Sequence, residues 1–216
     1  MVVIDFSAFQ VPGVKWQALL VHVYRWDPIQ DEEVSTPYIV FPTEVATNDA
    51  ALFKIAFESV IEEVRSSFRF NQLFIWSDGG RKHFKQRYAM KYVMEMQRKL
   101  KVPITWNFFA SHHGHGVCDA DASHVKQAVR KAQRHRHIFI RTASQLMKIA
   151  HGVGRTLGRL VFPPSRKKPA AGALKNMTQY HQFTFDPAQN IVNGYEVSYN
   201  QSNNTQWSIW KNAKSS

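Results

Sequence analysis

The sequence predicts an α/β fold in which a mixed five-stranded sheet carries helices on both faces, with a small C-terminal β-hairpin region added. Short apolar runs rich in β-branched and aromatic residues recur along the chain, and helical spacing of apolar residues appears between the later runs. Apolar residues make up 44% and charged residues 20% of the 216 residues. This composition is typical of a globular domain with a sizeable core.

The first three apolar runs predict an antiparallel meander. Residues 2–6 and 16–26 read as strands separated by the Pro12-Gly13 turn signal. Residues 36–42 follow, with a proline near each end, where a strand tolerates it.

Beyond the meander, the apolar spacing becomes helical and helices alternate with strands. Residues 48–67 predict a helix with Asn48 as its N-cap. The later elements are expected at 71–77 (strand), 82–100 (helix), 103–109 (strand) and 119–136 (a basic helix). This order, a three-strand meander followed by alternating helices and strands, is the order of the ribonuclease-H fold.

Composition divides the chain into four parts. Residues 1–137 are expected to form the ribonuclease-H-like core, and residues 138–162 a helical extension that opens with a short strand, HIFIRT. Residues 163–175 form a basic Pro-rich linker, and residues 176–216 a C-terminal hairpin region and tail. Within the last part, Asp186-Pro187 and Asn193-Gly194 are both turn signals.

The charge balance favours a polyanionic partner. Lys and Arg total 28 against 16 Asp and Glu, and a net charge of +12 attracts nucleic acid first and acidic membranes second. Solubility alone is the other explanation. The sequence has no apolar run of membrane-spanning length and no signal-peptide pattern. Cys118 is the only cysteine, so a reducing compartment is expected, either the nucleus or another intracellular one. A start inside an apparent strand suggests a fragment of a longer protein.

Three acids stand where the predicted topology would bring them together. Asp5 interrupts an apolar strand, Asp78 ends another and precedes two glycines, and Asp119 begins a helix after a glycine-punctuated loop. Strands one and four are neighbours in the predicted sheet, and the helix after strand five packs back near them. Taken alone, Asp5 is explained equally well as a turn or capping residue, and Asp78 and Asp119 are explained better in that way. The functional hypothesis therefore depends on all three meeting at one edge of the sheet.

A cluster of carboxylates is unstable without positive charge between its members. Mg²⁺ or Mn²⁺ suits such oxygen ligands, keeps part of its water shell and binds phosphate. Two such ions about 3.5–4 Å apart can activate a water or a 3′-hydroxyl and stabilise the leaving oxygen of a phosphodiester. Asp5, Asp78 and Asp119 are the expected catalytic and metal-binding residues, with Asp121 as an alternative or additional ligand.

Four segments resemble motifs of a large group of eukaryotic transposon-derived proteins. VIDFSAF is similar to their VDFSENY-type first strand, and WSDGGRKHFKQRY to their SDG-x-x-x-QFK-x-RY segment. WNFFASHHGHGVCDADASHVK is similar to FFA-x-S-HGKG-x-x-DG-x-GG-x-VKR, and YHQF with NGYEVS resembles their H-x-F hairpin region. The resemblance covers nearly the whole chain. It implies a ribonuclease-H-like, transposase-type core acting on DNA, with Asp5, Asp78 and Asp119 as the aligned acids.

The chain departs from these motifs in several places. His83 stands where glutamine is usual, and His115 where lysine is usual. Ala120, Ala122 and Ser123 replace glycines, which should lengthen the helix from its start. The departures leave the acids intact and bear instead on how the chain handles DNA.

Basic residues near the acids are expected to contact nucleic acid. Lys126, Arg130 and Arg134 share one face of the predicted helix, which favours a phosphate-binding track over a merely solvated surface. The expected nucleic-acid-binding residues are Lys82, Lys85, Arg87, His113, His115, Lys126, Arg130 and Arg134. A zinc site made by the loop histidines with Cys118 and His124 is the alternative, although no second pair of ligands is apparent.

The leading hypothesis is a metal-dependent domain that nicks DNA or transfers its strands. One alternative is a domesticated DNA- or chromatin-binding module that has lost catalysis. Another is a nuclease of the same fold that acts on RNA or DNA. The sequence leaves the target site open, and a homo-oligomer is compatible with it.

Overall fold

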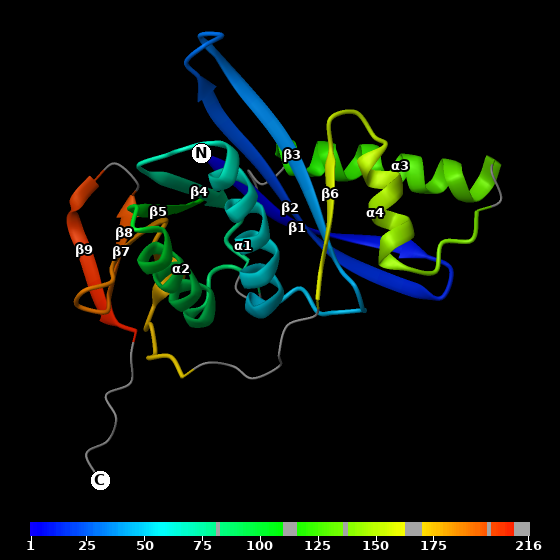
Figure 1. Cartoon of the computed structure of the whole chain (residues 1–216). Helices are drawn as coiled ribbons and strands as arrows, with labels where there is room; N and C mark the ends of the chain where they lie inside the picture. Colours follow the sequence, from blue (N-terminus) through cyan, green and yellow to red (C-terminus); the bar gives the residue numbers. More distant parts are fainter. Residues whose placement is uncertain (81–82, 110–115, 136–137, 163–169, 198–199, 210–216) are drawn as a thin grey trace.

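The computed structural model describes the whole chain except residues 81–82, 110–115, 136–137, 163–169, 198–199 and 210–216. The described residues form four α-helices, one short 3-10 helix and nine strands, which belong to one mixed sheet. The strand order is β6-β3-β2-β1-β4-β5-β7-β8-β9 (Figure 1). The expected mixed α/β class is confirmed, but the sheet is wider than the five strands predicted.

The N-terminal meander forms as predicted, with longer strands. β1 (Val2–Val11), β2 (Val14–Asp27) and β3 (Glu32–Pro42) pair antiparallel in sequence order. Gly13 turns the chain between β1 and β2 with a φ of +78°, a conformation that favours glycine. Pairing of β2 with β3 continues to the far end of both strands, so this hairpin projects beyond the rest of the sheet (Figure 1).

The central part of the chain alternates helices with parallel strands. α1 (Ala50–Ser67) leads to β4 (Leu73–Ser77), and α2 (Arg87–Leu100) leads to β5 (Ile104–Phe108). β4 pairs parallel with β1, and β5 pairs parallel with β4. The N-cap of α1 is Asp49 rather than the expected Asn48. The Asp49 carboxylate accepts hydrogen bonds from the backbone N–H groups of the first helical turn.

The two faces of the sheet carry different helices. α1 and α2 pack on a core that includes Ile4, Ile75 and Trp106. α3 (Val117–His135) and α4 (Ala143–His151) pack on the other face, over a second core that includes Phe9 and Leu20. Alternation along β1 therefore turns its odd-numbered side chains toward α3. None of the described helices is long and apolar enough to cross a membrane.

The last third of the chain adds strands at both edges. β6 (Leu157–Val161) pairs parallel with β3, whereas residues 138–142, expected to form part of a short strand, lie in none. After the 3-10 helix η1 (Met177–Gln179), β7 (Gln182–Asp186), β8 (Ile191–Val197) and β9 (Asn200–Ser208) extend the sheet beyond β5.

The expected turn at Asn193-Gly194 is wrong, because both residues lie inside β8 and the turn is at 187–190. A Cβ atom at Gly194 would meet ring atoms of Trp207 at 2.6 and 2.7 Å. Glycine therefore serves close packing of the Trp207 ring here, not a turn.

Candidate functional site

Asp5 and Asp78 lie side by side on the face of the sheet that α3 covers. The parallel register of β1 with β4 pairs Ile4 with Ser77. Continuing that register by one residue puts Asp5 beside Asp78, which directly follows the end of β4. Side chains at paired positions of neighbouring strands point to the same face, so both carboxylates turn toward α3.

The electrostatic environment of Asp5 is unfavourable to its charge. The pKa of the carboxyl is raised from 3.8 to about 7, chiefly because the group is buried, and then because Asp78 and Asp119 are negatively charged. The backbone N–H of Phe6, which donates to Oδ1 at 2.7 Å, and the Lys126 ammonium both lower the pKa. Asp5 is therefore the carboxyl on which the charges of two other acids act, one directly after β4 and one at the start of α3.

A glycine makes room for the carboxylate of Asp78. The backbone N–H of Gly80 donates to Asp78 Oδ1 at 3.3 Å, so the side chain turns back over its own loop. A Cβ atom at Gly80 would lie 3.2 Å from both carboxylate oxygens. The absence of a side chain at Gly80, the second of the two glycines after Asp78, therefore leaves room for the Asp78 carboxylate.

Asp119 occupies the first turn of α3 and is exposed. Cys118 in this turn and Ala122 in the next are buried against the sheet, whereas Asp119 between them is exposed. Lys126 follows two helical turns later on the same side, with its ammonium 5.6 Å from the ring centre of Phe9. This placement explains why Asp119 and Lys126 both act on Asp5, with opposite signs.

Asp121 has a different partner. Its Oδ2 lies 2.7 Å from Nδ1 of His22 in β2, and the two side chains are only 17% and 8% exposed. Positions i and i+2 of a helix point about 200° apart, so Asp121 reaches β2 while Asp119 does not. Sequence reasoning did not identify His22, because the partners are 99 residues apart and no local pattern links them.

The carboxylates do not form a ready coordination sphere. Among the described residues, no group of three or more His, Cys, Asp or Glu side chains is placed to hold a metal ion as it stands. The donor chemistry nevertheless fits a hard divalent cation. The acids around Asp5 offer carboxylate oxygens, and the positive charge near Asp5 does not offset its burial and the neighbouring negative charges. Asp119 is exposed in the first turn of α3, where its carboxylate accepts a hydrogen bond from the backbone N–H of Gly116 at 3.4 Å.

The expected basic track is only partly realised. Arg130 and Arg134 are exposed on α3, and Lys126 and Arg87 are partly exposed. Lys85, by contrast, is buried: its ammonium donates to the Thr178 carbonyl at 2.9 Å and lies 5.1 Å from the ring centre of Phe108. Lys85 therefore ties the start of α2 to η1 and does not belong to an exposed track. Lys82, His113 and His115 lie outside the described residues.

The cysteine is poorly suited to the alternative zinc site. Cys118 is buried, and its thiol donates to the Val3 carbonyl at 3.4 Å. Burial raises the pKa of the Cys118 thiol, and the charges of Asp5 and Asp121 raise it further. A metal requires the thiolate, which this position disfavours. His124 is exposed on α3.

One protein family matches most of the chain. The sequence profile of a family described as a domain of unknown function (DUF8701) covers residues 16–182. The chain belongs to this family. The DUF8701 match runs from β2 to the first residue of β7, so it contains Asp78, Asp119 and Asp121 but begins after Asp5. No curated protein matches the chain, and no solved structure does.

Proposed function

We propose that this DUF8701 protein is a metal-dependent polynucleotidyl transferase with a ribonuclease-H-like core, which nicks DNA or transfers its strands. The observation that carries the proposal is the cluster around Asp5. Burial of Asp5 in β1 and the charges of Asp78, directly after β4, and Asp119, at the start of α3, raise the pKa of Asp5 to about 7. A divalent cation relieves this repulsion and binds phosphate at the same time.

The topology supports the same proposal. The sub-order β3-β2-β1-β4-β5, with β1 to β3 antiparallel and β4 and β5 parallel to β1, is the one expected of a ribonuclease-H-like core. α3 lies on the opposite face from α1 and α2 and begins beside the acids. β6 at one edge and β7 to β9 at the other are then additions to this core.

Each residue of the cluster has a role in this proposal. Asp5, Asp78 and Asp119 would hold Mg²⁺ or Mn²⁺, which supplies an activated water or 3′-hydroxyl and neutralises charge at the leaving oxygen. Lys126 balances part of the negative charge at Asp5 and is placed to meet a phosphate beside it. Arg130 and Arg134 continue the same side of α3 and hold further backbone phosphates without reading sequence.

One observation favours a second candidate, a DNA- or chromatin-binding module without catalysis. Lys126 already places a positive charge near Asp5, and the described carboxylates are not closed around an ion position. In that case Lys126 alone balances the cluster, and the basic side of α3 does the binding. A nuclease acting on RNA or DNA would use the same acids as the transferase, so only the substrate distinguishes it from the first proposal.

Metal binding separates the transferase from the binding module. Thermal unfolding of the protein, stripped with a chelator, is followed with and without millimolar Mn²⁺ or Mg²⁺. An ion at a hundred times its Kd adds about 2.7 kcal/mol to the free energy of unfolding, so the melting temperature should rise. Asp119→Asn should remove most of that rise. Asp121→Asn, in which the altered side chain lies against His22, should keep it. An unchanged melting temperature with both ions would favour the binding module.

A further inference from the structure

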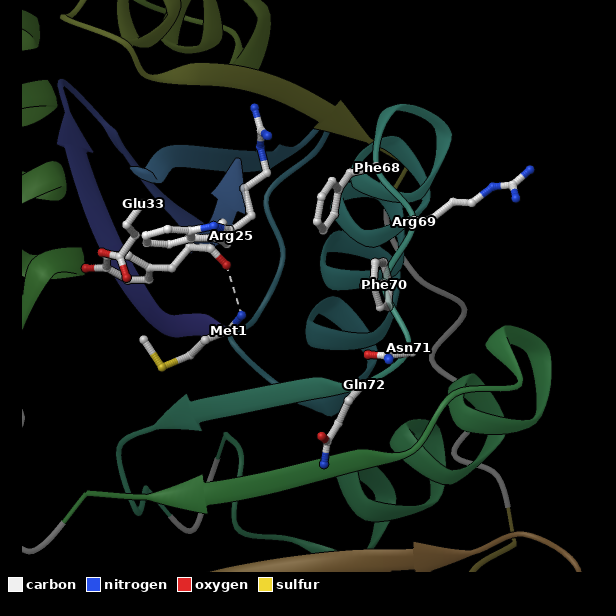
Figure 2. Close-up of a pocket in the computed structure, with 10 residues that line it drawn as sticks. Met1, Arg25, Glu33, Phe68, Arg69, Phe70, Asn71 and Gln72 are labelled. Atoms are coloured by element: carbon white, nitrogen blue, oxygen red, sulfur yellow. Dashed lines mark hydrogen bonds between the residues drawn. The ribbon is translucent and has the colours of Figure 1, made fainter. Parts of the chain in front are cut away.

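A large cleft lies at the opposite end of the sheet from the acids. It has a volume of about 740 Å³ and opens between the end of β2 and the 68–72 segment that joins α1 to β4 (Figure 2). β1 and β4 run parallel, and the cleft is at their amino ends, whereas Asp78 follows the carboxyl end of β4. The cleft is lined by Met1, Tyr24, Arg25, Trp26, Glu33, Phe68, Arg69, Phe70, Asn71 and Gln72.

Aromatic side chains from two segments line this cleft. β2 supplies Tyr24 and Trp26, and the linker supplies Phe68 and Phe70. Trp26 is 55% exposed, so much of its indole is available to a ligand. In Figure 2 the ring of Phe68 faces the β2 side of the cleft, while Arg69 extends the other way. The cleft therefore offers flat aromatic surfaces to its occupant, together with the side chain of Met1.

Polar groups accompany the rings. The guanidinium of Arg25 lies 5.6 Å from the ring centre of Phe68 and 3.6 Å from the Asp27 carboxylate. Asn71 and Gln72 are exposed at the end of the linker wall, and each amide can both donate and accept hydrogen bonds. Glu33 is the one acid among the lining residues and stands opposite the linker (Figure 2).

We propose that this cleft binds unpaired bases of a single-stranded nucleic acid. A nucleobase has two flat faces for stacking and an edge of donors and acceptors, which corresponds to the rings and amides of the lining. Aromatic platforms combined with arginine are the usual means of holding single strands without reading their sequence. The net charge of +12 adds a long-range attraction for the phosphates. A volume of about 740 Å³ is large enough for a nucleotide-sized ligand.

This inference does not require the acid cluster to bind metal or to be catalytic. The test therefore uses the whole chain with a chelator present, and measures anisotropy of a labelled oligothymidylate and of a labelled duplex of the same length. Trp26→Ala should weaken binding of the single strand about tenfold, because one base loses its stacking surface. Binding of the duplex should be nearly unchanged. Trp26→Phe should retain most of the affinity, because a stacking surface remains.

Phe162→Ala is the matched control, because Phe162 is 83% exposed and does not line the cleft. It should bind the single strand like the unmodified chain. A double variant, Asn71→Ala with Gln72→Ala, removes exposed amides without touching the core and should also lower single-strand affinity selectively. Thermal unfolding establishes that each variant is folded.

Three results would overturn the proposal. The first is an equal response of Trp26→Ala and Phe162→Ala, and the second is an equal loss of single-strand and duplex binding with Trp26→Ala. The third is Trp26-dependent binding of a trimethyllysine peptide by a chain that does not bind the oligonucleotide. Aromatic clefts with an acid such as Glu33 also suit a quaternary ammonium group.

Discussion

Replacing Asp5 with asparagine should stabilise the protein at neutral pH while removing a residue of the proposed active site. In the folded chain the pKa of Asp5 is about 7, against 3.8 for the ordinary carboxyl. The folded state therefore holds this proton more tightly than the unfolded state does. Well below pH 3.8 the carboxyl is neutral in both states, so it does not destabilise the folded state.

The Asp5 carboxyl destabilises the folded state progressively as the pH rises from about 4 to about 7. Over that range the unfolded chain releases the proton and the folded chain keeps it, so the free energy of unfolding falls. A pKa difference of this size corresponds to about 2–4 kcal/mol, the lower value allowing for solvent at a partly exposed group. The substituted asparagine would still accept the hydrogen bond from Phe6, since its side-chain oxygen can occupy the same place as Oδ1 of Asp5.

Urea unfolding at several pH values with a chelator present gives the assay. The difference in unfolding free energy between Asp5→Asn and the unmodified chain should be small near pH 4 and grow to its full value by about pH 8. Taking the difference removes the contribution of other titrating groups, such as histidines. Glu32→Gln, at an exposed position near the far end of the β2–β3 pairing, corrects for the loss of one negative charge. A difference that stays flat across this range would refute the view that the folded state disfavours ionisation of Asp5.

Three further predictions follow from particular contacts. Charge reversal at Arg130 and Arg134 should weaken duplex DNA binding for all sequences and flatten its salt dependence, and salt-independent binding would contradict the basic track. Asp121→Asn should lower the free energy of unfolding by about 1–3 kcal/mol, because it weakens a mostly buried hydrogen bond to His22. Denaturant titration measures this change, and no change would count against the hydrogen bond. Gly194→Ala should cost about 1–3 kcal/mol by forcing a Cβ against the Trp207 ring, whereas Gly79→Ala, with nothing within 4 Å, should be nearly neutral in the same assay.

Local sequence patterns predicted those parts of the fold whose signals are local. The Pro12-Gly13 turn, the apolar runs around Asp5 and before Asp78, and the helical spacing after residue 48 each place an element correctly. The acids could be connected because β1, β4 and α3 follow one another in a simple topology. That connection needed no knowledge of individual side-chain contacts.

The remaining features depend on partners that are distant in the sequence. β6 has no alternation of buried and exposed residues to reveal it, since all five of its residues are partly exposed. Asn193-Gly194 has the composition of a turn, but both residues pair with β7 and β9, and Trp207 packs over Gly194. Lys85 is charged and was therefore expected on the surface, but the Thr178 carbonyl supplies it with a buried acceptor.

The most direct test of the central claim is nicking of supercoiled plasmid DNA in Mn²⁺ or Mg²⁺. The account predicts metal-dependent conversion of supercoiled to nicked DNA by the unmodified chain. Asp119→Asn should abolish this conversion while still binding DNA with the same salt dependence, and Asp121→Asn should retain it at temperatures where that variant is folded. Nicking that persists equally in Asp119→Asn, or no nicking by a chain that binds DNA but shows no response to either ion, would contradict the proposed active site.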